Sequence, residues 1–188
     1  MNAAYVGEKY WAKPVFGVGD LSARLLIVGL AHGAHGANRT GVPFMGDTAG
    51  EFLFAGLERN GFAPNQSFES LKDVYITNAV KCAPPGNKPK TNEFHNCREY
   101  LLEELSLLKE VKVILALGEK AFLEVKRTLK EKGANVQHLK FGHGAEYKVQ
   151  GGFPDVIGSY HTSKLNINTK LIDVHKMDEI FFKIRKIL

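Results

Sequence analysis

Four short apolar runs, separated by stretches with helical periodicity, limit the folds open to this chain more than any other feature. The runs cover residues 24–30, 73–78, 111–117 and 155–159, and each is built around Val, Ile or Leu. Short apolar runs of this kind are typical of strands that are buried on both faces of a parallel sheet. We therefore expect four central strands.

The stretches between and after these runs predict four helices. Asp47 or Thr48 caps the first, which continues to about Asn60 before Gly61, and Thr91 caps the second. The third covers residues 118–132, and the fourth lies at the C-terminus. The apolar faces of the second and fourth helices consist of Phe94, Cys97, Leu101, Leu105 and Leu108, and of Met177, Ile180, Phe181, Ile184 and Ile187. Strands that alternate with helices predict a three-layer α/β/α sandwich with a mainly parallel central sheet.

Composition limits the remaining possibilities. A length of 188 residues predicts one domain, residues 1–188, and 44% hydrophobic with 24% charged residues excludes disordered, collagen-like and coiled-coil chains. No apolar run approaches the roughly 18 residues that cross a bilayer, and the stretch from Met1 to Trp11 has no signal-peptide pattern. Two cysteines do not form a disulfide scaffold. We expect a cytoplasmic protein without a membrane partner.

The charge balance is compatible with a polyanionic partner. Lysine and arginine exceed aspartate and glutamate by 25 to 20, which gives a net charge of +5, and the pI is near 9.1. A basic chain permits nucleic-acid binding but does not require it.

Ligands of parallel α/β sheets bind beyond the carboxyl ends of the strands. Four predicted connections leave those ends: residues 31–47, residues 79–90, the turn at Gly118, and residues 160–169. Three of the four contain unusual polar residues, which favours one shared site.

The first connection is long and rich in glycine, as functional loops often are. It lacks the phosphate-binding Gly-Lys-Ser/Thr pattern and the dinucleotide-binding glycine pattern. His32 and His35 have the spacing of metal ligands, but no carboxylate stands at ligand spacing nearby, which favours two hydrogen-bonded loop histidines. Phe44 belongs either to the core or to a ligand surface. Asp47 suits a helix N-cap, and the same carboxylate can also take part in chemistry.

The other connections add polar and basic groups. Asn78 ends an apolar strand, where a buried amide needs hydrogen-bond partners and is suited to reading the edge of a base. Lys81, Lys88 and Lys90 make the second connection basic. Leu165 is either an exposed wedge for a base stack or a buried contact beneath the next helix.

Several motifs in one order resemble the uracil-DNA glycosylase superfamily, and within it the type-5 (B-type) enzymes. They are GLAHGAHGANRTGVPFMGD at 29–47, NAVKCAPPGNKP at 78–89, FGHGAEY at 141–147, and SYHTS at 159–163 with Asn168 and Thr169. The resemblance extends from about Tyr10 to Leu171.

The resemblance implies an enzyme that flips uracil, and some other deaminated bases, out of DNA and hydrolyses the N-glycosidic bond. It implies that Phe44 stacks on the base, that Asn78 reads its Watson–Crick edge, that Asp47 and Asn87 hold the attacking water, and that His161 faces the uracil O2. Further base-pocket residues are Gly29 and Ala31, and the DNA-contacting residues are Lys81, Lys88, Lys90, Ser163, Lys164 and Leu165. The partner is uracil-containing DNA, the expected state is a monomer, and no cofactor is required for bond cleavage.

The sequence departs from the family pattern at three places. His32 stands where a proline is usual. Leu30-Ala31 lacks the acidic or amide residue of other superfamily branches, so the role of holding the attacking water depends on Asp47. Family members hold a [4Fe–4S] cluster with four cysteines, of which only the later pair is matched, by Cys82 and Cys97. Either the natural start lies upstream of Met1, or this member has lost the cluster.

Two other classes of function remain open from the sequence. A metal-dependent hydrolase would use His32, His35, Asp47, His143 and His161. A non-catalytic module would bind DNA through phosphate contacts and release no base.

Overall fold

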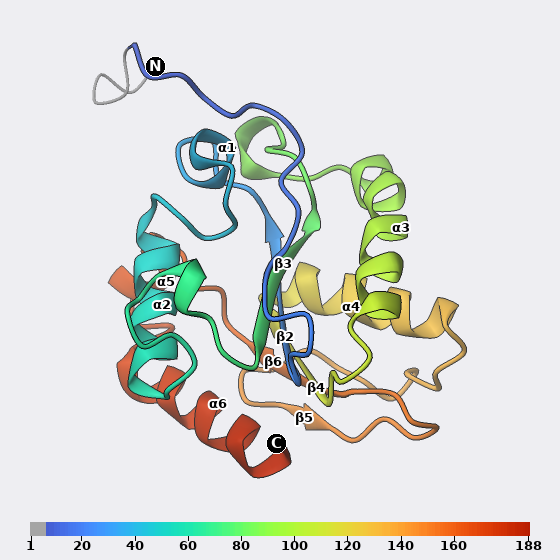
Figure 1. The fold of residues 1–188 in the computed structure, drawn as a ribbon. Helices are drawn as coiled ribbons and strands as arrows, with labels where there is room; N and C mark the ends of the chain where they lie inside the picture. The colour runs from blue at the N-terminus through green and yellow to red at the C-terminus, as the bar shows by residue number, and fades with distance from the viewer. Residues whose placement is uncertain (1–6) are drawn as a thin grey trace.

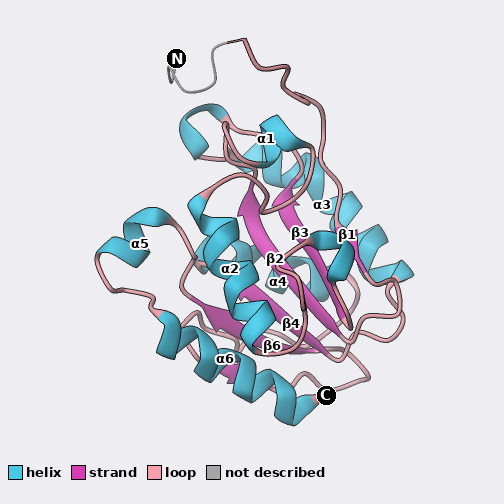
Figure 2. Ribbon diagram, turned by 60° about the vertical axis from the view of Figure 1, so that its left-hand side comes forward, coloured by secondary structure: helices cyan, strands magenta, loops and turns pink. Residues whose placement is uncertain are grey.

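A computed structural model describes residues 7–188, in which a six-stranded sheet is covered by helices on both faces (Figures 1 and 2). The prediction for the stretch from Met1 to Trp11 lies partly outside these residues. The strands are β1 (Val18–Gly19), β2 (Leu25–Ala31), β3 (Val74–Val80), β4 (Val113–Leu117), β5 (Glu146–Tyr147) and β6 (Asp155–Ser159). The α-helices are α1 (Ala37–Thr40), α2 (Thr48–Arg59), α3 (Thr91–Leu107), α4 (Glu119–Glu131), α5 (Lys164–Asn168) and α6 (Val174–Ile187). Two 3₁₀ turns are η2 (Phe68–Ser70) and η3 (Pro85–Asn87).

The strand order is β1-β3-β2-β4-β6-β5. The four predicted strands β2, β3, β4 and β6 are mutually parallel, whereas β1 and β5 pair antiparallel at the two edges. The prediction of an α/β fold with a mainly parallel sheet is therefore confirmed. The two-residue edge strands were not predicted, because they are too short to show a periodic pattern.

Alternating side chains of each central strand point into two separate hydrophobic cores, one on each face of the sheet. Leu25 and Ile27 of β2 face the layer that contains α2 and α6, while Leu26 and Val28 face the layer that contains α3 and α4. This follows from the period of two in a strand, which sends successive side chains to opposite faces. Figure 2 shows α2 and α6 together on one side of the sheet, and the result is the predicted three-layer arrangement.

Helix starts follow local hydrogen-bonding rules. The Asp47 carboxylate caps α2 by accepting from the Gly50 N–H at 3.0 Å, and Asp173 caps α6 in the same way through the Lys176 N–H. The N-cap of α3 is Lys90 rather than the predicted Thr91, because the Glu93 carboxylate accepts from the Lys90 N–H at 2.6 Å.

The topology opens a crevice at the carboxyl ends of β2 and β3. After β2 the chain enters α2 on one face of the sheet, and after β3 it enters α3 on the other face (Figure 1). Loops that diverge in this way leave a gap above the strand ends, where ligands of such sheets bind. Over the residues described, no helix combines the length and the apolar character needed to span a membrane.

Candidate active site

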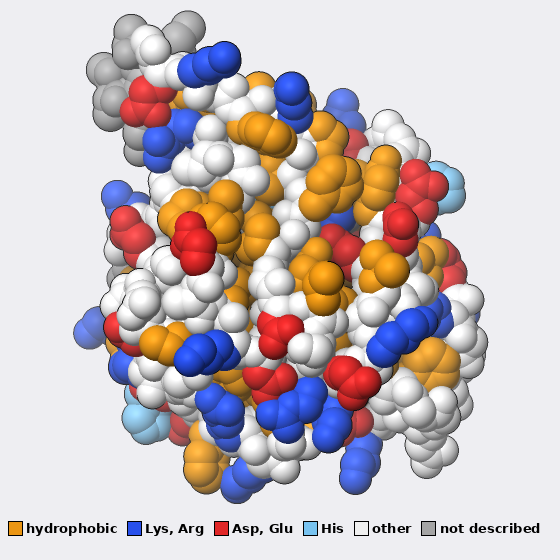
Figure 3. All heavy atoms as spheres, viewed as in Figure 1, with side chains coloured by type: hydrophobic (Ala, Val, Ile, Leu, Met, Phe, Trp, Pro, Cys, Tyr) orange, Lys and Arg blue, Asp and Glu red, His pale blue; other side chains and the backbone are white. Residues whose placement is uncertain are grey.

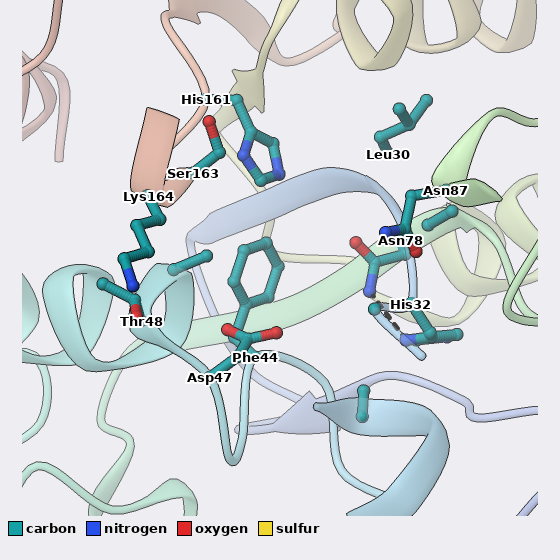
Figure 4. A pocket seen from close by; sticks show the side chains of 14 residues that line it. Leu30, His32, Phe44, Asp47, Thr48, Asn78, Asn87, His161, Ser163 and Lys164 are labelled. Carbon is teal, nitrogen blue, oxygen red and sulfur yellow. Dashed lines mark hydrogen bonds between the residues drawn. The ribbon is translucent and has the colours of Figure 1, made fainter. Parts of the chain in front are cut away.

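A cavity of about 480 Å³ lies at this crevice (Figure 4). It is lined by Leu30, Ala31, His32, Gly33, Ala37, Phe44, Asp47, Thr48, Ala49, Asn78, Asn87, His161, Ser163 and Lys164. The fold thus brings together residues from three of the predicted connections, including all five residues that the resemblance places at the reacting base. Gly33, Ala37, Thr48 and Ala49 were not predicted, because small residues carry no chemical signal in a sequence.

Phe44 forms one wall of the cavity, and its backbone is unusual. Its φ of 55° lies in the left-handed region, and only 7% of the residue is exposed. The first turn of α2 holds this conformation, since a Cβ added to Gly50 would lie 1.7 Å from the Phe44 carbonyl oxygen. The Phe44 and His161 rings have centroids 6.2 Å apart and planes 29° apart. A flat ligand on Phe44 would therefore lie close to the imidazole.

Asp47 uses its two carboxylate oxygens differently. Oδ1 accepts the capping hydrogen bond from Gly50. Oδ2 lies over the glycine-rich loop, where a Cβ added to Gly36 would be 2.2 Å from it and one added to Gly33 would be 3.1 Å away. The sequence left open whether Asp47 caps a helix or does chemistry, and this geometry allows both at once.

His161 is held by its neighbours on the last connection. The Asn166 side chain donates to the His161 carbonyl oxygen at 2.8 Å, and the Thr162 hydroxyl donates to the Ala49 carbonyl oxygen at 3.0 Å. Burial lowers the pKa of His161 below its ordinary value of 6.5, against the opposing effect of Asp47. At neutral pH the imidazole is therefore uncharged, and one of its two ring nitrogens carries a proton that it can donate.

Asn78 and His32 form a buried pair at the floor of the cavity. Asn78 Nδ2 and His32 Nδ1 are 3.1 Å apart, and His32 Nε2 is 3.1 Å from the Val15 carbonyl oxygen. Burial lowers the pKa of His32 to about 4, more than the Val15 carbonyl raises it. Gly29 stands beside Asn78 in the sheet, and a Cβ there would lie 2.1 Å from Asn78 Oδ1. The absence of a side chain at Gly29 therefore makes room for the amide.

The comparisons with known proteins agree with this geometry. Residues 16–185 match the family described as the uracil DNA glycosylase superfamily. The chain belongs to this superfamily. It is 40% identical to a type-5 uracil-DNA glycosylase of Thermus thermophilus, over 98% of this chain and 84% of that protein. It is 41% identical to a type-5 uracil-DNA glycosylase of Pyrobaculum aerophilum, over 94% and 77% of the two chains. A type-4 uracil-DNA glycosylase of the same organism is 37% identical over 69% of this chain and 63% of that protein.

Two of the predicted DNA-contacting residues, Ser163 and Lys164, line the cavity of this superfamily member. Lys88, Lys90 and Lys164 are exposed, and Ser163 caps α5 by accepting from the Asn166 N–H. Asn87 ends the η3 turn with a φ of 55° and is exposed at the edge of the cavity. Leu165 is 71% exposed, which excludes the alternative of a buried contact. On the face seen in Figure 3, Lys and Arg side chains lie at both ends, so net charge alone does not mark a binding edge.

Lys81 requires a correction. It is 1% exposed, and its ammonium group donates to Glu104 Oε2 at 2.7 Å and to the Thr77 hydroxyl at 2.6 Å. The Thr77 hydroxyl in turn donates to Glu104 Oε1 at 2.9 Å. The prediction that Lys81 borders a DNA groove is wrong, because β3 continues to Val80 and places Lys81 inside the α3 layer.

The two cysteines do not fit a [4Fe–4S] cluster held by the residues described. Cys97 Sγ accepts from the Lys81 N–H at 3.5 Å, while Cys82 is exposed. Partial burial, Cys97 and Glu93 raise the pKa of the Cys82 thiol above its ordinary value. Two thiols are half of the usual ligand set, and residues 7–188 contain no group of three or more potential metal ligands.

The two loop histidines take separate hydrogen bonds. His32 bonds to Val15 and Asn78, whereas His35 Nδ1 is 2.6 Å from the Tyr10 hydroxyl. This bears out the hydrogen-bonding interpretation of the H-x-x-H spacing and does not favour a metal-dependent hydrolase. The link from His32 to Asn78 was not predicted, because no sequence signal connects a residue of the loop after β2 with a residue of β3.

Replacing Lys81 and Lys88 should have opposite consequences. Lys81→Ala leaves Glu104 buried without its partner and should lower the free energy of unfolding by roughly 3–5 kcal/mol. Lys88→Ala, at an exposed position, should cost less than about 0.5 kcal/mol and reduce the salt slope of DNA binding by about one unit. Urea unfolding measures the free energy of unfolding of each variant, and salt titrations of oligonucleotide binding measure the salt slope. A stable Lys81→Ala protein with a reduced salt slope would contradict the buried assignment.

The pKa of His32 predicts a pH dependence of stability. Because the pKa is about 4 in the folded protein and 6.5 in the unfolded chain, the unfolded chain binds a proton first as the pH falls. Folding should therefore lose about 3 kcal/mol as the pH falls from 6.5 to 4. His32→Gln lacks this titration, so its stability should fall less over the same interval. Equal pH dependence of the two proteins in urea unfolding would show that His32 titrates normally.

Proposed function

We propose that this protein excises uracil from DNA, using the cavity at the ends of β2 and β3 to hold the extruded base. The observation that carries the proposal is the convergence of an aromatic ring, a buried amide, a carboxylate and a neutral imidazole in one cavity, in a member of the uracil-DNA glycosylase superfamily. The type-5 relatives are named for the same activity. The protein is thus a hydrolase of N-glycosyl bonds and acts in DNA repair.

The base must leave the duplex before it can reach this cavity, and unstacking it costs a few kcal/mol. Phe44 offsets part of that cost by stacking on the base, and its backbone packs against the start of α2. Asn78 reads the Watson–Crick edge from the cavity floor, beside Gly29 and Ala31. Leu165, exposed on α5, is placed to fill the gap left in the base stack, with Ser163 and Lys164 beside it. Lys88 and Lys90 contact the phosphate backbone.

Bond cleavage separates charge between the sugar and the base. The electrons of the C1′–N1 bond stay on uracil, and positive charge develops at C1′ of the sugar. His161 donates a hydrogen bond to the uracil O2, while Asp47 Oδ2 lies on the side of the sugar and of the attacking water, which Asn87 also holds. Fixed groups aimed at developing charges lower the barrier without reorganising. Water adds to C1′ and loses a proton to the carboxylate or to solvent, the uracil anion takes up a proton at N1 from solvent, and the products are free uracil and an abasic site.

No cofactor enters these steps, each of which uses only side chains of this chain. We further propose that residues 1–188 act as a single domain and a monomer on intracellular DNA, because one chain supplies every group of the cavity. The direct test is to incubate a uracil-containing oligonucleotide with the protein, with and without a chelator. Alkali-labile abasic sites in both samples are expected. Their absence in both would leave a DNA-binding module, and their loss with chelator would indicate a metal enzyme.

Asp47→Asn should separate capping from catalysis. The amide oxygen can still accept from the Gly50 N–H, so stability should change by less than about 1 kcal/mol. Base release should fall by roughly two orders of magnitude or more, because an amide neither balances the sugar cation nor accepts a proton. Single-turnover release of uracil, with a thermal midpoint for each protein, measures both. Nearly full activity of the Asp47→Asn protein would show that another residue holds the attacking water.

Phe44→Leu should weaken binding of the extruded base by removing the stacking contact, while an apolar side chain remains in the wall of the cavity. Base–aromatic stacking contributes roughly 1–3 kcal/mol per base, so single-turnover kcat/KM should fall by about 5- to 150-fold. Phe52→Leu makes the same substitution on α2, away from the cavity lining, and is the matched control. Equal rates for the two variants would argue against stacking on Phe44.

A further inference from the structure

The buried pair of Asn78 and His32 contains one polar atom without a partner. Asn78 is 2% exposed, and its Oδ1 is the one fully buried side-chain nitrogen or oxygen in residues 7–188 that makes no hydrogen bond. Figure 4 shows the Asn78 amide with its nitrogen turned toward His32 and its oxygen turned away from it. An unpaired buried acceptor is costly, so a bound N–H donor would stabilise the site.

The orientation of the amide follows from one backbone carbonyl. The Val15 oxygen can only accept, so His32 Nε2, 3.1 Å away, must carry the imidazole proton. His32 Nδ1 is then a bare acceptor, consistent with the lowered pKa of this buried residue. The atom of Asn78 that lies 3.1 Å from Nδ1 must be the NH₂ group, since a rotated amide would set two acceptors against each other.

The Val15 carbonyl is itself fixed. Val15 is buried, and its N–H donates to the Lys81 carbonyl oxygen at 2.8 Å. Lys81 is the charged group that acts on the His32 ring, and its positive charge further lowers the pKa of His32. A chain of hydrogen bonds therefore runs from the backbone of Lys81 through Val15 and His32 to Asn78, and the donor and acceptor of each bond are determined.

The free oxygen points to the place where a stacked base would present its edge. The position of a Cβ on Gly29 is 2.1 Å from Asn78 Oδ1 and 2.6 Å from Phe44 Cζ, so the oxygen and the ring edge are neighbours above this glycine. A base on the Phe44 face would direct its edge at Oδ1, while the second N–H of the Asn78 amide remains to donate to an adjacent carbonyl.

We propose that His32 is a positioning residue that sets the base specificity of the site by fixing the Asn78 amide with its oxygen toward the ligand. This inference rests on the proposed function. The fixed amide selects bases in which a ring N–H stands next to a carbonyl. Uracil presents N3–H and O4 in this order, whereas cytosine presents a bare N3 and an amino group, which would oppose both atoms of Asn78. Deamination converts the second pattern into the first, so the device discriminates damaged from normal pyrimidine.

Two substitutions at position 32 test this directly. In His32→Gln the side-chain NH₂ can donate to Val15 and the side-chain oxygen can accept from Asn78, which keeps the amide orientation. His32→Leu has a similar volume but no polar atom, so the amide can rotate. We expect His32→Leu to release uracil about tenfold more slowly, the kinetic equivalent of one hydrogen bond, and His32→Gln to remain within about threefold of wild type.

The decisive readout is the ratio of uracil to cytosine release in single-turnover assays on matched oligonucleotides. A merely structural loss would lower both rates together, whereas a rotated amide lowers uracil release and narrows the ratio. An unchanged ratio in a folded His32→Leu protein would overturn the proposal. Wild-type protein that releases no uracil would instead overturn the proposed function.

A measurement on the wild-type protein covers the case in which His32→Leu does not fold. Nitrogen-15 NMR of the imidazole reports which ring nitrogen carries the proton. We expect a protonated Nε2 and a bare Nδ1 for His32 between pH 6 and 8, with or without DNA. A proton on Nδ1 would force the Asn78 oxygen toward His32 and would overturn the proposal irrespective of activity.

Discussion

Strands β2 and β3 pair in a parallel register that sets Gly29 beside Asn78, and the geometry of the cavity depends on this pairing. A slip of one residue would place a side chain against the amide and turn Asn78 to the other face of the sheet. The hydrophobic residues of both faces prevent such a slip, because β2 is buried on both sides between two helical layers. The packing that stabilises the fold thus also fixes the position of the base-reading group.

The polar residues of the cavity are held in place in a similar way. Each is held by one of its atoms and leaves another available: Asp47 is fixed through Oδ1, Asn78 through Nδ2, and His161 through its backbone carbonyl. The fixing partners belong to helix caps, loops and backbone, so the orientation of each group is set before a ligand arrives. Groups fixed before the reaction are the ones that contribute most to stabilising developing charge.

The sequence predicted the central elements well, because apolar runs and helix caps are local signals. The strand Asp155–Ser159 agrees at both ends, and Asp47 caps α2 as expected. Errors arose where tertiary structure decides. Two further residues in β3 turned Lys81 from a loop residue into a buried one, and its partner Glu104 lies 23 positions away on α3. The pairing of His32 with Asn78 joins the loop after β2 to β3 and depends on a backbone carbonyl that no sequence pattern indicates.

The contact between the Thr162 hydroxyl and the Ala49 carbonyl oxygen joins the loop of His161 to the first turn of the helix capped by Asp47. Helix ends and loops are normally the segments that open most readily through local fluctuations. Here the two segments share a partly buried hydrogen bond, so opening one of them removes the hydrogen-bond partner of the other. The two sides of the cavity therefore form a single cooperative unit: hydrogen exchange in the two segments should be correlated, and a partly assembled site should be rare.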